Sequence, residues 1–410
     1  MIKKTLYTAL IFSLLSCEDQ YTEIHRYTKQ FHLTKDYPIY LDASEILIDI
    51  QVTNPIQSNK PFKIVANHSY YFVGEKMKGI HVFKKNDDYQ ATPLCFIKCN
   101  HLKSFDVADN ILYCNNFVDL LAIDVEHPLQ AKILQREREY FNNHAYDNSL
   151  KAPSIGNHIY LIGYKQIVLY GVETETNPAP NFSEYDKLYS NIMVKEIPDT
   201  LQTAKPYVGF VNIENKVFTL GTTFYFPLAL CSFDSGKLQI TESEINAGYY
   251  SSPVSDLQYK GNVLYIISTN TALGFIRDNE AFIPNNYFSN GYIPFDMVAI
   301  KKFQYSHAVL SGRATIETFT YDYIRGYTYE SILPSLGAAC LLNVNDYILA
   351  LGKQLTIYST HLQNNPLETM MQYSNISGNS MLQDGNTLIV AGVEGLSFYD
   401  ISNLWNIKKR

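Results

Sequence analysis

A short pattern of strand, turn and strand recurs along this chain of 410 residues and constrains its fold more than any other feature. The clearest copy covers residues 104–128, where polar and apolar residues first alternate as in a half-buried strand. Asp109 and Asn110 follow, and both residue types tolerate the positive φ angles of a two-residue hairpin turn. Short apolar runs at 111–114 and 120–123 come next and are typical of buried strands. Each copy therefore predicts a small group of short, consecutive strands.

The turn of this pattern returns at nearly regular intervals. Copies lie near residues 68, 110, 157, 215, 262, 306, 346 and 386. A period of roughly 40 to 47 residues with about four short strands per copy is typical of a β-propeller blade. One such sheet cannot bury both of its faces, and stacking against neighbours around an axis buries them. The sequence therefore predicts an all-β fold, a β-propeller of seven or eight blades with eight favoured by the count of turns. A large β-sandwich or a β-solenoid is the alternative.

One copy also carries a family resemblance. Residues 119–128, which read DLLAIDVEHP, resemble the repeat of the LVIVD-repeat proteins, which are lipoproteins and surface proteins common in Bacteroidota. A second, degenerate match lies at 398–403, and residues 54–83 look like the opening blade of that family. The resemblance implies a β-propeller with no established activity, and it supplies no catalytic residue.

The first residues have the pattern of a bacterial lipoprotein signal. Two lysines precede an apolar run at 6–15, which is too short to span a bilayer. Residues 14–17, which read LLSC, resemble a lipobox. In lipoproteins of this kind the cysteine thiol takes a diacylglycerol, so Cys17 is the predicted lipid attachment site and residues 1–16 the predicted signal peptide. The alternative is an ordinary secretory signal with a coincidental cysteine.

The residues after Cys17 bear on location and domain organisation. Glu18 and Asp19 are similar to the tag that exports Bacteroidota lipoproteins to the outer leaflet, and a charged linker is the alternative. The sequence predicts a lipid-anchored protein of the outer membrane, with its outer face favoured. Residues 17–43 have no clear periodicity and are predicted to be a tether, and residues 44–410 are predicted to be the propeller.

Several segments fall outside the regular repeat. Residues 45–52 are predicted to be a strand that completes the last blade beside residues 396–401, because ring closure removes exposed sheet edges. Three insertions interrupt the period, at 135–151, 173–206 and 282–295. Alternating charges in the first predict a solvated face. The third is aromatic and rich in asparagine, like a binding loop, or it packs its aromatic rings on the propeller. We expect a partner, if bound, to contact these three loops.

Charge and motifs narrow the function classes. The net charge is −7 with dispersed basic residues, so there is no basic stripe for nucleic acid. The ten histidines do not cluster with cysteine at zinc spacing, and no dinucleotide, phosphate-loop or hydrolase motif occurs. No metal, cofactor or catalytic residue is therefore predicted. His81 is predicted to be a strand residue, and structural hydrogen bonds are expected at Asp106, Asp119, Asp124 and Asp400.

Five cysteines remain besides Cys17, namely Cys95, Cys99, Cys114, Cys231 and Cys340. An envelope protein can oxidise some of its thiols, and a bond between Cys99 and Cys114 across a hairpin is one alternative. Buried free thiols are the favoured state.

Three functional hypotheses follow from these observations. The first is a lipid-anchored β-propeller that binds or scaffolds an envelope protein or a glycan. The alternative is a glycan hydrolase or lyase, whose acid pair would come from several blades and meet in the central cavity. A third hypothesis is a purely structural envelope component, which would expose large apolar patches and no polar pocket.

Overall fold

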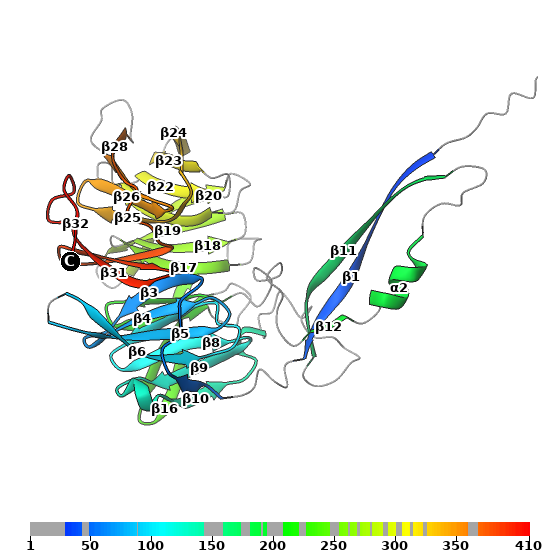
Figure 1. Ribbon diagram of the computed structural model, residues 1–410, viewed down its shortest axis with the longest axis horizontal. Coiled ribbons are helices and arrows are strands. Elements are labelled where there is room, and N and C mark those ends of the chain that lie inside the picture. Colours follow the sequence, from blue (N-terminus) through cyan, green and yellow to red (C-terminus); the bar gives the residue numbers. More distant parts are fainter. Residues whose placement is uncertain are drawn as a thin grey trace, which may run out of the picture. The chain divides into compact units, whose positions relative to one another are not determined.

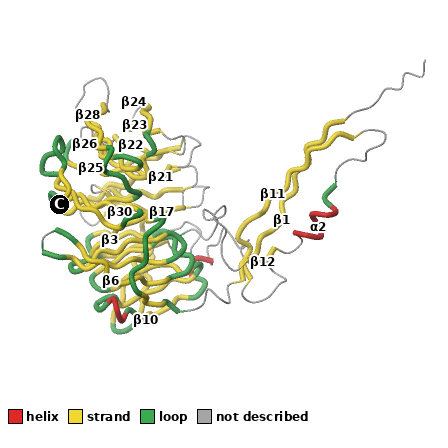
Figure 2. The backbone as a smooth tube through the Cα atoms, in the orientation of Figure 1, coloured by secondary structure: helices red, strands yellow, loops and turns green. Residues whose placement is uncertain are grey.

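The computed structural model describes residues 29–42, 49–87, 89–142, 159–173, 181–189, 192–194, 208–220, 227–246, 254–260, 263–268, 271–278, 281–289, 294–300, 306–311, 315–322, 326–359 and 368–410. Most of the described residues lie in β-strands, so the predicted all-β class is confirmed (Figure 2). The helical elements among them are short: α2 (Ser183–Tyr189), η2 (Pro128–Gln130) and η3 (Tyr140–Asn142). The chain divides into two compact units, one of Met1–Ile39 with Tyr164–Ile192 and a larger one of Tyr40–Gly163 with Met193–Arg410.

The smaller unit is built on a three-stranded sheet with the order β11 (Ile159–Glu173), β1 (Lys29–Asp42), β12 (Ile192–Val194). Tyr37 of β1 is buried, and its hydroxyl donates a hydrogen bond to Oδ1 of Asp186 in α2 at 2.6 Å. The ammonium group of Lys35 lies 2.5 Å from the same oxygen. These polar contacts tie the helix to the central strand. Much of the segment predicted to be a tether, residues 17–43, is therefore a paired strand; residues 17–28 lie outside the described part.

The repeat copy near residue 157 does not form a four-stranded sheet. Its two apolar runs, at 159–162 and 167–170, belong to the single strand β11. They do not fold back on each other, because β11 takes β1 as its partner. A strand crossed by a few polar residues has the same local composition as a hairpin, which is why the sequence suggested an eighth copy. The turn itself, at 156–157, lies outside the described residues.

The described residues of the larger unit form seven antiparallel sheets, in which neighbouring strands mostly follow each other along the chain (Figure 1). We number them I to VII. Sheet I holds β2 (Gln51–Thr53), β3 (Pro61–Ala66), β4 (Tyr70–Glu75), β5 (Gly79–Lys85) and β6 (Ala91–Lys98). Sheet II holds β7 (Phe105–Ala108), β8 (Ile111–Asn116), β9 (Asp119–Asp124) and β10 (Lys132–Glu137). Sheet III holds β13 (Phe210–Ile213), β14 (Lys216–Leu220), β15 (Pro227–Asp234) and β16 (Lys237–Asn246).

The remaining four sheets have the same order. Sheet IV holds β17 (Val254–Lys260), β18 (Val263–Ser268), β19 (Thr271–Asp278) and β20 (Ala281–Ser289). Sheet V holds β21 (Pro294–Ile300), β22 (Ser306–Ser311), β23 (Thr315–Asp322) and β24 (Gly326–Pro334). Sheet VI holds β25 (Ala338–Val344), β26 (Tyr347–Gly352), β27 (Leu355–Ser359) and β28 (Glu368–Tyr373). Sheet VII holds β29 (Ser380–Asp384), β30 (Thr387–Gly392), β31 (Gly395–Asp400) and β32 (Lys408–Lys409).

The other seven predicted turn positions each fall between the first two long strands of one sheet. The chemistry predicted for these turns is observed where they are described. Asp109, Asn345 and Gly385 have φ angles of 50°, 55° and 58°, which favour the small polar residues and glycine found there. Asn67 acts differently, because its side-chain oxygen accepts a hydrogen bond from the backbone N–H of Tyr70 at 2.8 Å. Local turn chemistry thus fixes where each sheet begins.

The predicted closure by an N-terminal strand is wrong for the residues that the structure describes. Gln51 and Val52 pair with β6, so β2 becomes the fifth strand of sheet I. The fourth strand of sheet VII is instead β32, from the C-terminal end. The backbone N–H of Arg410 donates to the carbonyl of Phe398 at 2.8 Å and extends that pairing. Residues 43–48, the first part of the predicted strand, lie outside the described residues.

Successive sheets contact one another in a cyclic order. The first long strands touch between I and II, II and III, III and IV, V and VI, VI and VII, and VII and I, while IV and V touch through β18 and β21. Shared apolar cores lie at these contacts. Phe72 of sheet I and Phe105 of sheet II belong to one core, and Tyr71 and Phe398 join sheets I and VII in another. Each sheet therefore buries its faces against its neighbours.

A buried ion pair ties three of the first strands together. The ammonium group of Lys63 in β3 lies 2.8 Å from Oδ2 of Asp106 in β7 and donates to the carbonyl of Phe210 in β13, also at 2.8 Å. The backbone N–H of Asn212 donates to the same Asp106 oxygen at 3.0 Å. The Asp106 side chain is 7% exposed, so its charge depends on these partners. The expected structural role of Asp106 is confirmed.

Replacing Asp106 should test how strongly this pair holds the sheets. We expect Asp106→Ala to lower the free energy of unfolding by about 3 kcal/mol, because it leaves the Lys63 charge without its buried partner. Urea unfolding followed by tryptophan and tyrosine fluorescence would measure the loss. Asp234→Ala, at the exposed turn between β15 and β16, is the matched control and should change stability by less than about 0.5 kcal/mol. Equal effects of the two substitutions would contradict this account.

Candidate functional site

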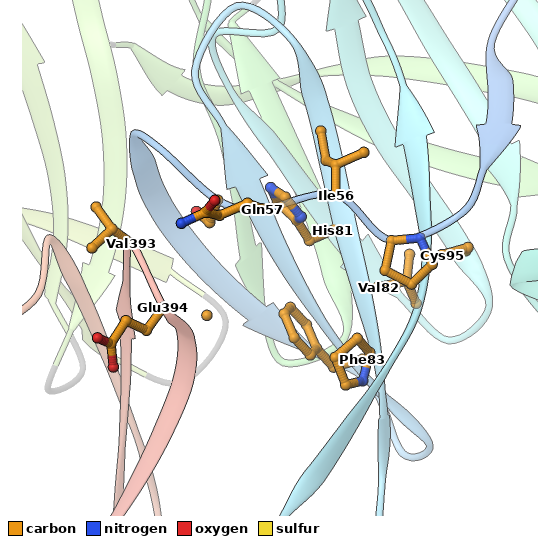
Figure 3. Close-up of a pocket in the computed structure, with 12 residues that line it drawn as sticks. Ile56, Gln57, His81, Val82, Phe83, Cys95, Val393 and Glu394 are labelled. Carbon is orange, nitrogen blue, oxygen red and sulfur yellow. The ribbon is translucent and has the colours of Figure 1, made fainter.

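A pocket of about 240 Å³ lies between sheets I and VII (Figure 3). One wall is the segment 55–58 that leads into β3, together with the facing side chains of β5 and β6. The other wall is the turn between β30 and β31 at residues 393–395. The pocket thus lies where the first and last sheets of the larger unit meet, and segments from opposite ends of that unit build it.

Gly79 fixes the position of the strand that crosses the pocket. A Cβ atom at this residue would lie 2.2 Å from the carbonyl oxygen of Ile97 and 2.9 Å from the backbone nitrogen of Cys99. Only glycine lets the two backbones approach this closely. The pairing of Gly79 with Lys98 then sets the register of β5, which carries His81 two residues later. The local sequence therefore places the imidazole in the pocket wall.

His81 and Glu75 form a buried polar pair at this wall. His81 is 3% exposed and Glu75 is 1% exposed. The Nε2 atom of His81 lies 3.4 Å from Oε2 of Glu75. The imidazole packs on the ring of Phe96, with 4.8 Å between ring centroids. His81 was predicted to be a strand residue, and that prediction is confirmed; its exposure to a pocket was not foreseen.

Glu75 holds its charge in spite of being buried. Burial raises the pKa of this carboxyl, but hydrogen bonds from His81, from the backbone N–H groups of Asn59 and Lys60 and from the Ser58 hydroxyl outweigh it and lower the pKa to about 2. The Lys60 N–H donates to Oε1 at 2.8 Å and the Ser58 hydroxyl to Oε2 at 3.1 Å. The carboxylate therefore fixes both His81 and the segment that forms the pocket wall.

The rest of the lining is mainly apolar. Val82, Phe83 and Pro93 line its inner surface, and Ile56 and Val393 flank it with 45% and 54% of their surface exposed. Glu394, an exposed residue, is the acidic one among the lining residues. A pair of facing carboxylates, which glycoside hydrolysis needs, is therefore not present among the lining residues. The arrangement suits an apolar group that ends in one hydrogen-bonding atom, which His81 can meet.

None of the three loops predicted to bind a partner lines this pocket. In the first, Arg136 is only 12% exposed and lies 2.9 Å from the buried Asp119, so the prediction of a solvated face is wrong for this residue. In the second, α2 and β12 belong to the smaller unit or its edge. In the third, residues 281–289 are the strand β20 and not a loop. Residues 143–150, 195–207 and 290–293 lie outside the described residues.

The other predicted residues have structural settings. Asp119 also accepts from the N–H of Glu139 at 2.8 Å, Asp124 from that of Glu126 at 3.0 Å, and Asp400 from that of Ser402 at 2.9 Å, so the expected structural bonds are confirmed. Cys17, the predicted lipid attachment site, lies outside the described residues.

The five other cysteines are free thiols in the structure. The sulfur atoms of Cys99 and Cys114 lie 4.0 Å apart, in hydrogen-bond contact and without a covalent bond. Cys95 lines the pocket, and burial raises the pKa of its thiol to about 11. Burial also raises the pKa of Cys114 and of Cys231. Cys340 is half-buried, and it is the most accessible of the five.

Two further searches complete the description of the site. The described residues bring together no group of three or more histidine, cysteine, aspartate or glutamate side chains that could hold a metal ion. Within the same part of the chain, no helix is long and apolar enough to cross a bilayer.

Comparisons with known proteins give similarity in fold alone. No family model matches the sequence, and no curated protein matches it, so the resemblance to LVIVD-repeat proteins stays a prediction. Among solved structures, the computationally designed protein Ika8 is similar at 9% identity, over 92% of this chain and 90% of that one, with a TM-score of 0.46. Candidate 6-phosphogluconolactonases from Bacteroides uniformis and Bacteroides fragilis match at 10% and 9% identity, each over 88% of this chain and 94% and 93% of their own, with TM-scores of 0.44 and 0.45. Such scores carry no argument about chemistry.

The charge of Glu75 gives a pH-dependent prediction. Glu75→Gln should lower the free energy of unfolding by about 2–3 kcal/mol at pH 7, because an amide cannot accept all the bonds that the carboxylate accepts. The folded pKa of about 2 lies below the ordinary 4.5, so this stabilisation is present above pH 4.5 and is lost as the pH falls towards 2. The gap between the two proteins in urea unfolding should close over that range. Glu126→Gln, an exposed control, should show no such gap, and a gap independent of pH for Glu75→Gln would refute this assignment.

Thiol labelling gives a second prediction for this region. In a Cys17→Ser background, Ellman's reagent at pH 8 should react first with Cys340, because burial keeps Cys95, Cys114 and Cys231 protonated. Adding Cys340→Ser should remove the fast phase, and the buried thiols should react only in denaturant. Fast labelling that survives Cys340→Ser would show that one of the buried sites opens in the folded protein.

Proposed function

We propose that the larger unit is a seven-bladed β-propeller that acts as a binding or scaffold module at the cell envelope. The cyclic order of contacts among sheets I to VII and the regular turn chemistry support this architecture. The eight blades favoured by the turn count are not proposed, since the copy near residue 157 belongs to the sheet of β11. The resemblance to LVIVD-repeat lipoproteins favours the same reading.

The observation that carries the binding role is the pocket between sheets I and VII. Its imidazole is fixed by a carboxylate that is itself held by three further hydrogen-bond donors, so His81 is pre-organised before a ligand arrives. The side chains of Ile56 and Val393 add apolar surface at the sides. Apolar surface around one polar anchor is typical of sites that take a protein side chain. We therefore favour a protein partner over a glycan, and binding over the alternative of glycan hydrolysis or cleavage.

The anchor is a separate part of the proposal. We infer that Cys17 carries the lipid, that residues 1–16 are removed, and that the protein is held in the outer membrane with its outer face favoured. The lipobox-like residues 14–17 support this, and Glu18 and Asp19 support the side.

Lipid labelling tests the anchor directly. Cells grown with an alkyne-tagged fatty acid should label the wild-type protein, and Cys17→Ser should abolish the label and release the protein from the membrane fraction. Cys340→Ser is the matched control and should be labelled like the wild type. Labelling of Cys17→Ser at the wild-type level would refute the assignment.

Site-specific crosslinking tests the binding role. A photoreactive phenylalanine at position 56 should capture one envelope protein in cells, because Ile56 flanks the pocket and is 45% exposed. Capture should fall at least about tenfold with His81→Leu, which removes the polar anchor. The same photoreactive residue at Leu129, which is 62% exposed and does not line the pocket, is the control and should not capture that protein. Capture of one protein from both positions would contradict the pocket, and no protein from position 56 would replace the protein partner by a glycan.

A further inference from the structure

Three lysines from separate segments lie close together at the ends of the first strands of sheets I and II. Lys60 directly precedes β3, Lys76 directly follows β4, and Lys103 lies just before β7. Backbone hydrogen bonds join the segments, from the N–H of Lys76 to the carbonyl of Lys60 at 3.2 Å and from that of Met77 to the carbonyl of Leu102 at 2.9 Å. The fold therefore gathers three positive charges that are far apart in the sequence.

The lysine charges act on one another. Burial lowers the pKa of Lys103, and the charge of Lys76 lowers it further, to about 7. Burial also lowers the pKa of Lys76; Asp256 of sheet IV opposes this shift, while Lys60 adds to it. Because a like charge depresses a lysine pKa only at short range, the side chains of Lys76 and Lys103 must lie near each other. Placing these ammonium groups together costs free energy, and an anion between them would recover it.

A buried histidine lies beside the same group. His101 is 5% exposed, and its Nδ1 atom has no hydrogen-bond partner among the described residues. Burial lowers the pKa of His101 to about 4, and the charge of Lys103 contributes, so the ring is neutral at pH 7 and is close to that ammonium group. The backbone is held in place, since the N–H of His101 donates to the carbonyl of Met77 at 3.0 Å and its carbonyl accepts from Asn115 at 3.0 Å. A buried polar atom of this kind requires a partner, and a ligand oxygen would supply one.

We propose that these three lysines and His101 form a binding site for a tetrahedral oxyanion, either a free sulfate or phosphate ion or a phosphate monoester. The ammonium groups would neutralise the ligand charge, and the imidazole N–H would donate a directed hydrogen bond to one oxygen. None of the four residues lines the pocket between sheets I and VII, so this site is separate and does not depend on the proposed binding role there. Asp256 is the acidic residue acting on the group, and it limits the net positive charge.

Proton uptake on binding is the signature of this site. At pH 8 Lys103 is mostly neutral, and a bound dianion would favour its charged form. Sulfate does not titrate near pH 8, so the proton must come from the buffer. Isothermal titration of the purified full-length protein with sodium sulfate, in buffers of different ionisation enthalpy, should show about 0.9 protons taken up per sulfate, as a pKa near 7 implies. Affinity should weaken up to about tenfold per pH unit above pH 7.

Two variants separate this site from weak surface binding. Lys103→Met should fold well, because it removes a buried amine, and should abolish proton uptake and lower sulfate affinity at least about tenfold at pH 6.5. Lys237→Met, at the exposed turn before β16, is the matched control and should bind sulfate as the wild type does. Methyl phosphate in place of sulfate distinguishes the ligand source, since tighter binding of the ester would assign a phosphate monoester and equal binding a free ion. Sulfate binding that is unchanged in Lys103→Met, or that takes up no proton, would overturn the proposal.

Discussion

The apolar contact between sheets I and VII is the interaction on which the larger unit depends. Each sheet has two faces, and a row of such sheets leaves one face bare at each end. The packing of Tyr71 and Phe83 against Ile389 and Phe398 covers both end faces at once. The same contact brings the segment 55–58 next to the turn at 393–395, so the pocket exists only because the first and last sheets meet.

Glu75 connects this closure to the chemistry around it. It lies at the end of β4, and its carboxylate fixes His81 on one side and the N–H groups before β3 on the other. Lys60 takes part through its backbone, and Lys76 follows Glu75 directly. A single buried charge thus holds the pocket wall and lies next in sequence to the lysine group. Buried charges that are fully hydrogen-bonded in this way are costly to remove, because each partner would lose its acceptor.

The sequence predicted local features well and pairing partners poorly. Turn chemistry depends on a few φ angles, so the turns at Asp109, Asn345 and Gly385 could be read directly from the sequence. The strand β11 could not be told from a hairpin, because its partner β1 lies more than a hundred residues away in the chain. For the same reason the pocket was missed, since nothing in the sequence links Ile56 to Val393. The isolated His81 in an apolar strand was the one available signal.

The two sheets that flank the pocket have opposite chain ends at their edges. Sheet I ends in the early strand β2, sheet VII ends in β32, and no strand among the described residues is shared between them. The joint between them therefore lacks a hydrogen-bond ladder and is held by side chains and local polar contacts. It is the place where the ring can open at the lowest free energy, in the manner of a clasp. A ligand seated there would bridge the joint, so occupancy of the pocket and mechanical resistance of the whole ring would rise together.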